Sequence, residues 1–393
     1  MREFFARSAG QGGSMIYLDN AATTKVDERV VNVINKFFNE KYGNASSIHK
    51  RGVEANSELQ KAREIIAKSI NAKSHEIIFT SGGSEANNMA IKGVFFANKC
   101  KGHIISAKTE HDSVLACCEW VKEQGGEMTY LDVDKEGFVD IKKLREEIRK
   151  NTILVSIMHA NNEVGTIQNL KEIGKMCREK GVLFHTDACQ SYTKVDIDVR
   201  KDSLDLVSLN AHKIHGPKGI GALFVREGVR LEPLIHGGGQ EKGLRSGTEN
   251  IAFIAGFAEA VKISKKEDIE KMKRLRDRLI KGLVEVKGAR LNGAVGNNRL
   301  CNNVNFSFKG IEGEAIVLYL DAEGICCSTG SACSSKSLKP SHVLLALGLK
   351  PEEAHSSVRL SLSRENNEKE IDEAVNKVKK VVEKLKEISP YGK

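Results

Sequence analysis

Residues 204–220 read LDLVSLNAHKIHGPKGI, and this stretch indicates both the fold and the position of a reactive group. An apolar strand runs into a polar turn that holds Asn210, His212 and Lys213, and glycines and a proline then form a tight bend. A lysine at the mouth of a buried strand is poorly solvated, which lowers the pKa of its amine. A partly neutral amine can attack a carbonyl carbon, so Lys213 is the expected position of a Schiff-base lysine. The alternative is that Lys213 is an exposed loop lysine, one of 61 Lys and Arg residues. The rest of the sequence is needed to distinguish these two interpretations.

The segments before and after this stretch alternate between strand-like and helix-like patterns. Strands are predicted at residues 76–80, 103–107, 152–160, 182–187, 204–209 and 220–225. Helices are predicted at residues 84–97, 112–123 and 169–179. The run TILVSIMHA at 152–160 is nearly all apolar, which is typical of a strand covered on both faces. This order predicts an α/β fold with a mostly parallel, mixed sheet.

The pattern changes after about residue 257. A long charged helix, two strands, a shorter helix and a final Lys/Glu-rich helix predict a smaller α+β domain at the C-terminal end. We expect a large domain over residues 15–265, whose first fifteen or so residues are free to pack on the small domain, and a small domain over 266–393. Residues 1–14 are expected to be a disordered extension or a remnant of an expression vector.

Composition excludes several classes of protein. The net charge is +9, but acidic and basic residues are mixed and no basic block is interleaved with aromatics, so no direct nucleic-acid binding is expected. No run of 18 apolar residues is present, so no membrane span is expected. Nine cysteines without a CxxC pair indicate neither a disulfide framework nor a zinc site, which favours a reducing cytoplasm. Cys100, Cys117, Cys177 and Cys301 are expected to be buried as small apolar residues.

Residues 81–84 (SGGS) follow a predicted strand and open a predicted helix. Glycines let backbone N–H groups approach an anion closely, and a helix N-terminus favours negative charge. The segment lacks the GxxxxGK[ST] pattern of nucleotide binding, so a small phosphorylated cofactor is the better prediction. An ordinary serine-capped helix is the alternative for this segment taken alone.

Further polar residues lie where other strands are expected to end. Asp187 and Gln190 follow one strand, Asn162 follows another, and His111 begins the helix after a third. Ligands bind at the carboxyl ends of strands in open α/β sheets. Each residue alone is more often a cap or a satisfied core group, but several at one sheet edge favour a binding site. A lysine, a carboxylate for a protonated pyridine nitrogen and a phosphate cradle together predict pyridoxal phosphate.

The chain resembles the cysteine desulfurases, the NifS/IscS-like branch of the class V aminotransferase superfamily with the pyridoxal-phosphate fold type I. The resemblance spans nearly all of the chain from Met15 onward. It is carried by YLDNAATT (17–24), FTSGGSEANN (79–88), KTEH (108–111), SIMHANNEVGTIQ (156–168), HTDACQS (185–191), AHKIHGPKGIGALFVR (211–226), HGGGQEKGLRSGTEN (236–250), STGSACSS (328–335) and AHSSVRLSLSR (354–364).

The resemblance implies roles for the cofactor residues. Lys213 would bind pyridoxal phosphate covalently, Asp187 would pair with its pyridine nitrogen, and Gln190 would contact its ring hydroxyl. His111 would stack on the ring and assist proton transfer. The implied phosphate ligands are Gly83, Ser84, Asn210, His212 and, from a second subunit, Thr248. Asn210 stands where many relatives have serine, and its amide could still donate a hydrogen bond.

The resemblance also implies the substrate and sulfur-carrying residues. Asn162 would face the cofactor and the substrate, and Arg359 would bind the substrate carboxylate as a two-pronged donor. Cys333 would accept the sulfur atom, and its segment of small residues suits a nucleophile that must move. No metal is expected in the free enzyme, although Cys333 could ligate a transient iron–sulfur cluster with a scaffold partner.

The implied reaction removes sulfur from L-cysteine, leaving L-alanine and a persulfide on Cys333. That sulfur would supply iron–sulfur cluster assembly and the thiolation of tRNA and cofactors. The expected partners are L-cysteine, a second copy in a homodimer, an iron–sulfur scaffold protein and other sulfur acceptors. The alternatives are a selenocysteine lyase or an aminotransferase on the same scaffold, and a non-catalytic sulfur-relay protein.

Overall fold

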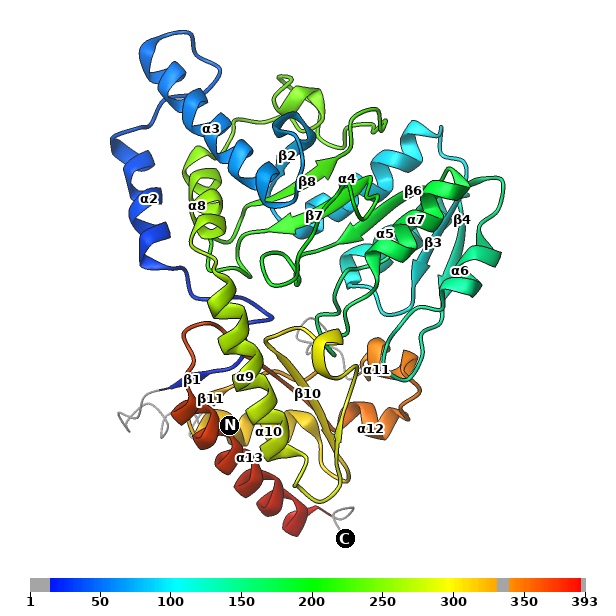
Figure 1. Ribbon diagram of the computed structural model, residues 1–393, viewed down its shortest axis with the longest axis vertical. Coiled ribbons are helices and arrows are strands. Elements are labelled where there is room, and N and C mark those ends of the chain that lie inside the picture. Colours follow the sequence, from blue (N-terminus) through cyan, green and yellow to red (C-terminus); the bar gives the residue numbers. More distant parts are fainter. Residues whose placement is uncertain (1–14, 331–338, 390–393) are drawn as a thin grey trace.

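The structure is a computed structural model that describes residues 15–330 and 339–389. Figure 1 shows a large region built on one broad sheet and a small region built on a separate sheet. The large region holds the elements of residues 28–262, and the small region holds those of residues 266–388 together with the first strand. Helix α9 (Lys266–Leu283) begins at the large region and runs down into the small one (Figure 1).

The sheet of the large region has seven strands in the order β2-β8-β7-β6-β5-β3-β4. Their bounds are β2 (Ile77–Thr80), β3 (His103–Ala107), β4 (Glu127–Leu131), β5 (Thr152–Ser156), β6 (Leu183–Asp187), β7 (Leu206–Asn210) and β8 (Gly221–Val225). Strands β3 to β7 pair in parallel, and β8 runs antiparallel to both of its neighbours. The sheet is therefore mixed and mostly parallel, as predicted.

Helices cover both faces of this sheet, which explains why its central strands are apolar throughout. The helices are α2 (Glu28–Asn39), α3 (Lys50–Ser69), α4 (Gly83–Ala97), α5 (Asp112–Glu123), α6 (Ile141–Glu147), α7 (Leu170–Lys180) and α8 (Ile251–Lys262). Ile104 packs in the core cluster with α4 and α5, whereas the next residue, Ile105, packs in the cluster with α3, α7 and α8. Successive side chains of a strand point to opposite faces, so each face has its own core.

The small region contains a three-stranded antiparallel sheet in the order β12-β10-β9. Its elements are β9 (Ala289–Leu291), β10 (Asn303–Phe308), α10 (Gly313–Ala322), β11 (Ile325–Cys326), α11 (His342–Ala346), α12 (Pro351–His355), β12 (Ser357–Ser361) and α13 (Glu368–Ile388). Strand β1 (Ile16–Tyr17) pairs in parallel with β11, and Ile16 lies in the core of the small region. Short 3-10 turns lie at Ser74–Glu76, Glu241–Gly243 and Gly296–Asn298.

Among the differences from the sequence predictions, three have a clear physical reason. The strand predicted at 152–160 ends at Ser156, because the chain turns there while staying buried. Strand β4 was not predicted, since it lies at the sheet edge and its residues are mostly half-exposed. The prediction that Cys100 is buried is wrong: Cys100 is exposed just beyond α4, where the backbone turns with a positive φ of 56°.

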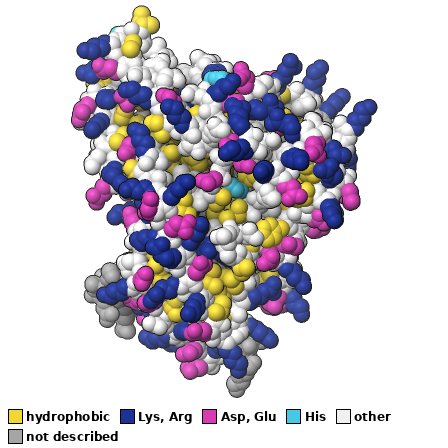
Figure 2. All heavy atoms as spheres, viewed as in Figure 1, with side chains coloured by type: hydrophobic (Ala, Val, Ile, Leu, Met, Phe, Trp, Pro, Cys, Tyr) yellow, Lys and Arg dark blue, Asp and Glu magenta, His cyan; other side chains and the backbone are white. Residues whose placement is uncertain are grey.

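Acidic and basic side chains are interspersed over the face shown in Figure 2, as the mixed charge pattern of the sequence indicates. Among the residues described, no helix combines the length and the apolar character that crossing a membrane requires.

Candidate active site

The predicted site residues meet at one edge of the large sheet. Because β5, β6 and β7 are parallel neighbours, their carboxyl ends lie side by side. Asp187 is the last residue of β6, Asn210 is the last residue of β7, and Lys213 follows in the turn to β8. His111 caps the N-terminus of α5, after the parallel strand β3.

Asp187 is a buried carboxylate held by directed donors. Its Oδ2 accepts a hydrogen bond from Asn87 Nδ2 at 2.8 Å, and its Oδ1 accepts one from the backbone N–H of Cys189 at 2.9 Å. Burial favours the neutral acid, but His111 and these donors outweigh it, so the pKa of Asp187 is lowered. A buried anion in this position can hold a protonated ring nitrogen.

His111 is linked to Asp187 through a short polar network. Asn87 Nδ2 also donates to Ser113 Oγ at 2.8 Å, and that hydroxyl lies 2.8 Å from His111 Nδ1. The backbone N–H of Ser113 donates to the same ring nitrogen at 3.1 Å. Burial lowers the pKa of His111, so the ring is neutral at pH 7. With Nδ1 accepting, the ring proton lies on Nε2.

The turn that carries Lys213 is braced by the N-terminal segment YLDNAATT. Thr24 donates to the carbonyl oxygen of His212 from both its backbone N–H and its hydroxyl, each at 2.9 Å. Gln190 Nε2 donates to the carbonyl oxygen of Ala21 at 3.0 Å. These contacts join residues more than 160 positions apart, so reasoning from local sequence did not assign a role to Thr24.

An open pocket of about 350 Å³ lies at the N-terminus of α4. Its lining includes residues 81–85, His212, Lys218 and Thr23, so the SGGS segment and the lysine turn share one anion-sized space. Gly83 cannot carry a side chain, because a Cβ there would lie 2.4 Å from the sulfur of Cys189. Because Gly83 has no side chain, the N-terminus of α4 can pack closely against the turn that follows Asp187.

Buried amide oxygens at this sheet edge lack partners. Within the described residues, Oδ1 of Asn87, Asn162 and Asn210 accept no hydrogen bond, although each atom is buried. An unpartnered buried polar atom destabilises a fold unless a ligand or water meets it. The anion pocket and the ionised Asp187 fit a flat phosphorylated pyridine such as pyridoxal phosphate, and the buried amide groups leave polar capacity around it.

Arg359 reaches the site from strand β12 of the small region. Its side chain is only 2% exposed, its Nη2 pairs with Asp19 Oδ1 at 2.9 Å, and its Nη1 donates to the carbonyl oxygen of Asn162 at 3.0 Å. The buried Nε of Arg359 has no partner among the described residues. Asn162 itself lies in the turn beyond β5 rather than at its last residue. Arg359 therefore has a free donor near the site.

The structure thus brings the predicted cofactor residues and Arg359 to one place, with two exceptions. Thr248 is exposed and does not line the anion pocket. Cys333 lies outside the described residues. Sequence reasoning also missed Asn87, Asp19 and Thr24, although all three lie inside segments that carry the resemblance.

Comparison with known proteins agrees with this geometry. The family model of class-V aminotransferases matches residues 16–374. The cysteine desulfurase IscS of Dictyoglomus turgidum is 49% identical over 381 residues, covering 96% of each chain. A solved NifS-like protein superposes with a TM-score of 0.89 at 38% identity, over 94% of this chain and 100% of that one. SspA in complex with cysteine gives a TM-score of 0.81 at 38% identity, over 89% and 99% of the two chains.

The chain therefore belongs to the class-V aminotransferase family. The predictions of a pyridoxal-phosphate-dependent enzyme and of the fold type are confirmed. Within that family its relatives are cysteine desulfurases, which confirms the predicted enzyme class.

Proposed function

We propose that the chain removes sulfur from L-cysteine with the residues gathered at this sheet edge, leaving L-alanine and a persulfide on Cys333. The observation that carries the assignment is the buried, ionised Asp187 beside the turn of Lys213, with Arg359 entering from the small region. The relative solved with cysteine supports the substrate.

In this assignment each cofactor residue has one task. When bound, pyridoxal phosphate supplies an electron sink for the α-carbon of the substrate. Lys213 would hold the cofactor covalently, and its amine would move a proton at the α-carbon of the substrate. Asp187 would hold a proton at the ring nitrogen and Gln190 would contact the ring hydroxyl. The neutral His111 would help to hold the ring and would move a proton at its Nε2. Gly83, Ser84, Asn210 and His212 are the proposed phosphate ligands.

Substrate binding and sulfur transfer use residues from both regions. Arg359 binds the carboxylate of the substrate, and Asn162 orients it. The thiolate of Cys333 attacks the substrate sulfur, so that a sulfur–sulfur bond forms as the carbon–sulfur bond breaks. Protonation of the remaining carbon fragment and release of its nitrogen as the α-amine yield alanine.

We also infer the assembly and the surroundings of the enzyme. Residues 15–265 and 266–393 act as a large and a small domain, and two copies form a homodimer in which Thr248 completes the phosphate site of the other copy. The exposed position of Thr248 suits that role. The persulfide serves an iron–sulfur scaffold protein, with which Cys333 can share a transient cluster, and other acceptors in the cytoplasm.

Two substitutions test the assignment. Lys213→Ala should abolish the visible absorption of the bound cofactor, whereas Cys333→Ser should keep that absorption and lose sulfur transfer to a protein acceptor. A Cys333→Ser enzyme with full transfer would overturn the role of Cys333. Alanine formed from cysteine without a keto acid separates the desulfurase from an aminotransferase, and a parallel assay with selenocysteine separates it from a selenocysteine lyase.

A further inference from the structure

A lysine that the proposed reaction does not use, Lys194, contacts the backbone of Lys213. The ammonium of Lys194 donates to the carbonyl oxygen of Gln190 at 2.9 Å and to the carbonyl oxygen of Lys213 at 3.1 Å. The side chain is partly buried. Among the residues described, no carboxylate lies within ion-pair distance of its Nζ. An ammonium taken from water without a counter-ion is costly, which indicates that its position serves a purpose.

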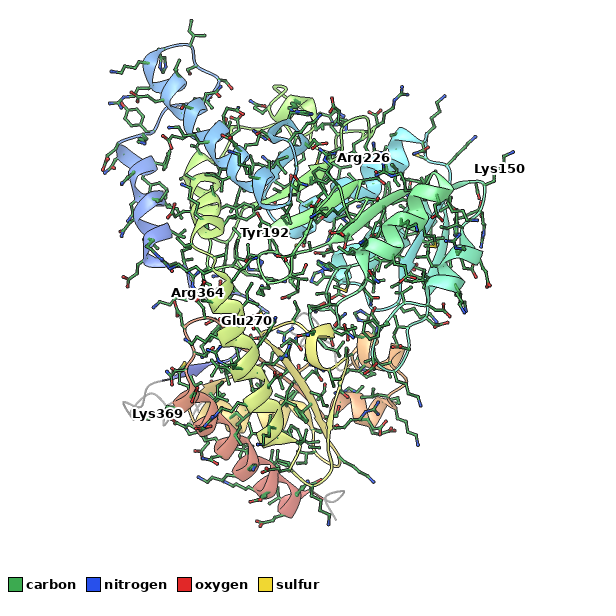
Figure 3. All side chains as sticks on the ribbon, in the orientation of Figure 1. Lys150, Tyr192, Arg226, Glu270, Arg364 and Lys369 are labelled. Atoms are coloured by element: carbon green, nitrogen blue, oxygen red, sulfur yellow. The ribbon has the colours of Figure 1, made fainter. Side chains whose placement is uncertain are left out.

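The two carbonyl groups belong to the two segments that form the site. Gln190 and Lys194 lie in one turn, residues 189–194, which follows β6, and Tyr192 anchors this turn in the core of the large region. The Tyr192 ring is fully buried against Phe257, and its hydroxyl lies 2.6 Å from Ser69 Oγ. Figure 3 labels Tyr192 within the large region. The Lys194 ammonium therefore ties a rigid turn to the backbone of the lysine turn.

We propose that Lys194 is a positioning residue: its ammonium holds the turn of residues 189–194 against the backbone of Lys213 and adds positive charge near the Lys213 side chain. The inference rests on the proposed function of Lys213. A neighbouring positive charge favours the neutral form of an amine or imine nitrogen, and the neutral amine is the reactive one.

The charged groups around Lys194 leave its own charge uncompensated. Lys194 and Lys213 line one cavity between the regions, together with His215, Lys265, Asp268 and Arg364. Arg364 is labelled in Figure 3 on the small-region side of this boundary. The acid Asp268 is 4.0 Å from Arg364, and the thiols of Cys189 and Cys301 are kept neutral by burial, which raises their pKa values. His212 and His215 are neutral too, since burial lowers their pKa values to about 4.

The same surroundings also change the pKa of the Lys194 amine. Burial, and repulsion from Lys213 to a smaller degree, lower the pKa of Lys194 to about 8. The ammonium is thus largely charged at pH 7, and the hydrogen bonds to the two carbonyl groups are charge-assisted, which makes them stronger than neutral ones.

The test is a pH titration of the visible absorption of the bound cofactor in the full-length holoenzyme. Lys194→Met removes the charge and both hydrogen bonds at similar volume, Lys194→Gln keeps a donor without the charge, and Lys194→Arg keeps both. Lys175→Met, an exposed lysine on α7, is the matched control. We expect the titration midpoint to rise by about one pH unit in the Met and Gln variants and to stay within about 0.3 unit in the Arg variant and the control.

A second readout tests the tie between the turns. The dissociation constant of pyridoxal phosphate, measured by absorbance on the apo protein, should rise about tenfold in Lys194→Met and less in Lys194→Gln. Unchanged midpoints in both neutral variants, or an equal rise in Lys194→Arg, would overturn the proposal. If Lys194→Met does not fold, the comparison of titration midpoints between the Gln and Arg variants tests the proposal. Absence of visible absorption in the unaltered protein would instead refute the role of Lys213.

Discussion

Two buried carboxyl groups, one at the end of β6 and one in the turn after the neighbouring strand β5, differ in their ionisation. Asp187, at the end of β6, is 5% exposed and has a lowered pKa. Glu163, in the turn after β5, is 2% exposed, and burial raises its pKa to about 7 despite the Ser341 hydroxyl and the charge of Arg359. Equal burial therefore does not produce equal charge.

The donors around each group explain the difference. Asp187 accepts two N–H hydrogen bonds from within its own region, besides the nearby His111 ring. Glu163 Oε2 accepts one hydroxyl hydrogen bond, from Ser341 at 2.5 Å, and Arg359 already pairs with Asp19. The Asp187 carboxylate can therefore hold a cationic ring. The Glu163 carboxyl group instead joins the large region to Ser341, the N-cap of α11.

The largest expected effect comes from removing the ionised member of the pair. Asp187→Ala should lower the rate of alanine formation from cysteine by about a thousandfold, because a buried charge at the reacting ring is lost. Cofactor retention, measured by visible absorption, should fall as well. Asp132→Ala, at an exposed carboxylate, is the control. A variant that keeps a tenth of the activity would contradict the role of Asp187.

A smaller effect is expected when Asp187 stays and one of its donors goes. Asn87→Ala removes the 2.8 Å hydrogen bond to Oδ2, so the pKa of Asp187 rises and its anion persists only at higher pH. We expect about a tenfold loss of activity and a shift of the acid limb of the pH–rate profile to higher pH. Asn98→Ala, beyond the other end of α4, should leave that limb in place. Loss of activity without the shift would indicate a merely structural role for Asn87.

Glu163→Gln tests the second, protonated carboxyl group. The folded-state pKa of Glu163 lies above its ordinary value of 4.5, so its proton stabilises the fold below pH 4.5, and this contribution is lost as the pH rises through about 7. Glutamine does not titrate. Between pH 5 and pH 8 the stability of Glu163→Gln relative to the unaltered chain should therefore rise by roughly 3 kcal/mol.

Urea unfolding of the apo protein at both pH values measures this difference, and Glu146→Gln, at an exposed glutamate, serves as the control. Other titrating groups contribute equally to both proteins and cancel. A stability difference that is the same at pH 5 and pH 8 would show that Glu163 titrates normally.

The smallest effect is expected at the hydroxyl that serves Glu163. Ser341 Oγ donates to the carboxyl group and also accepts from the backbone N–H of Leu344 as the cap of α11. Ser341→Ala should cost about 1 kcal/mol of stability at pH 8, where Glu163 is ionised, and less at pH 5. Ser341→Thr keeps both hydrogen bonds and should behave as the unaltered chain in the same unfolding measurement.

Much of the site could be predicted because its residues follow strands that are visible in the sequence. Asp187 ends a strand, and His111 and Lys213 follow strands within four residues. The parallel order of those strands brings their ends together. Their supporting partners could not be predicted. Asn87 lies 100 positions from Asp187, and Asp19 lies 340 positions from Arg359, so no local pattern links them.

The kinds of reactive group, the alternation of strands and helices and the sheet edge where the groups gather could be predicted from the chain alone, because they depend on residue type and on short-range periodicity. Which buried groups carry charge follows from the packing of the folded chain. Asp187 and Glu163 are both acids beside apolar runs, and the donors that distinguish them arrive through packing of distant segments. Charge in a buried site depends on the balance between desolvation and directed hydrogen bonds, which is set by three-dimensional contacts.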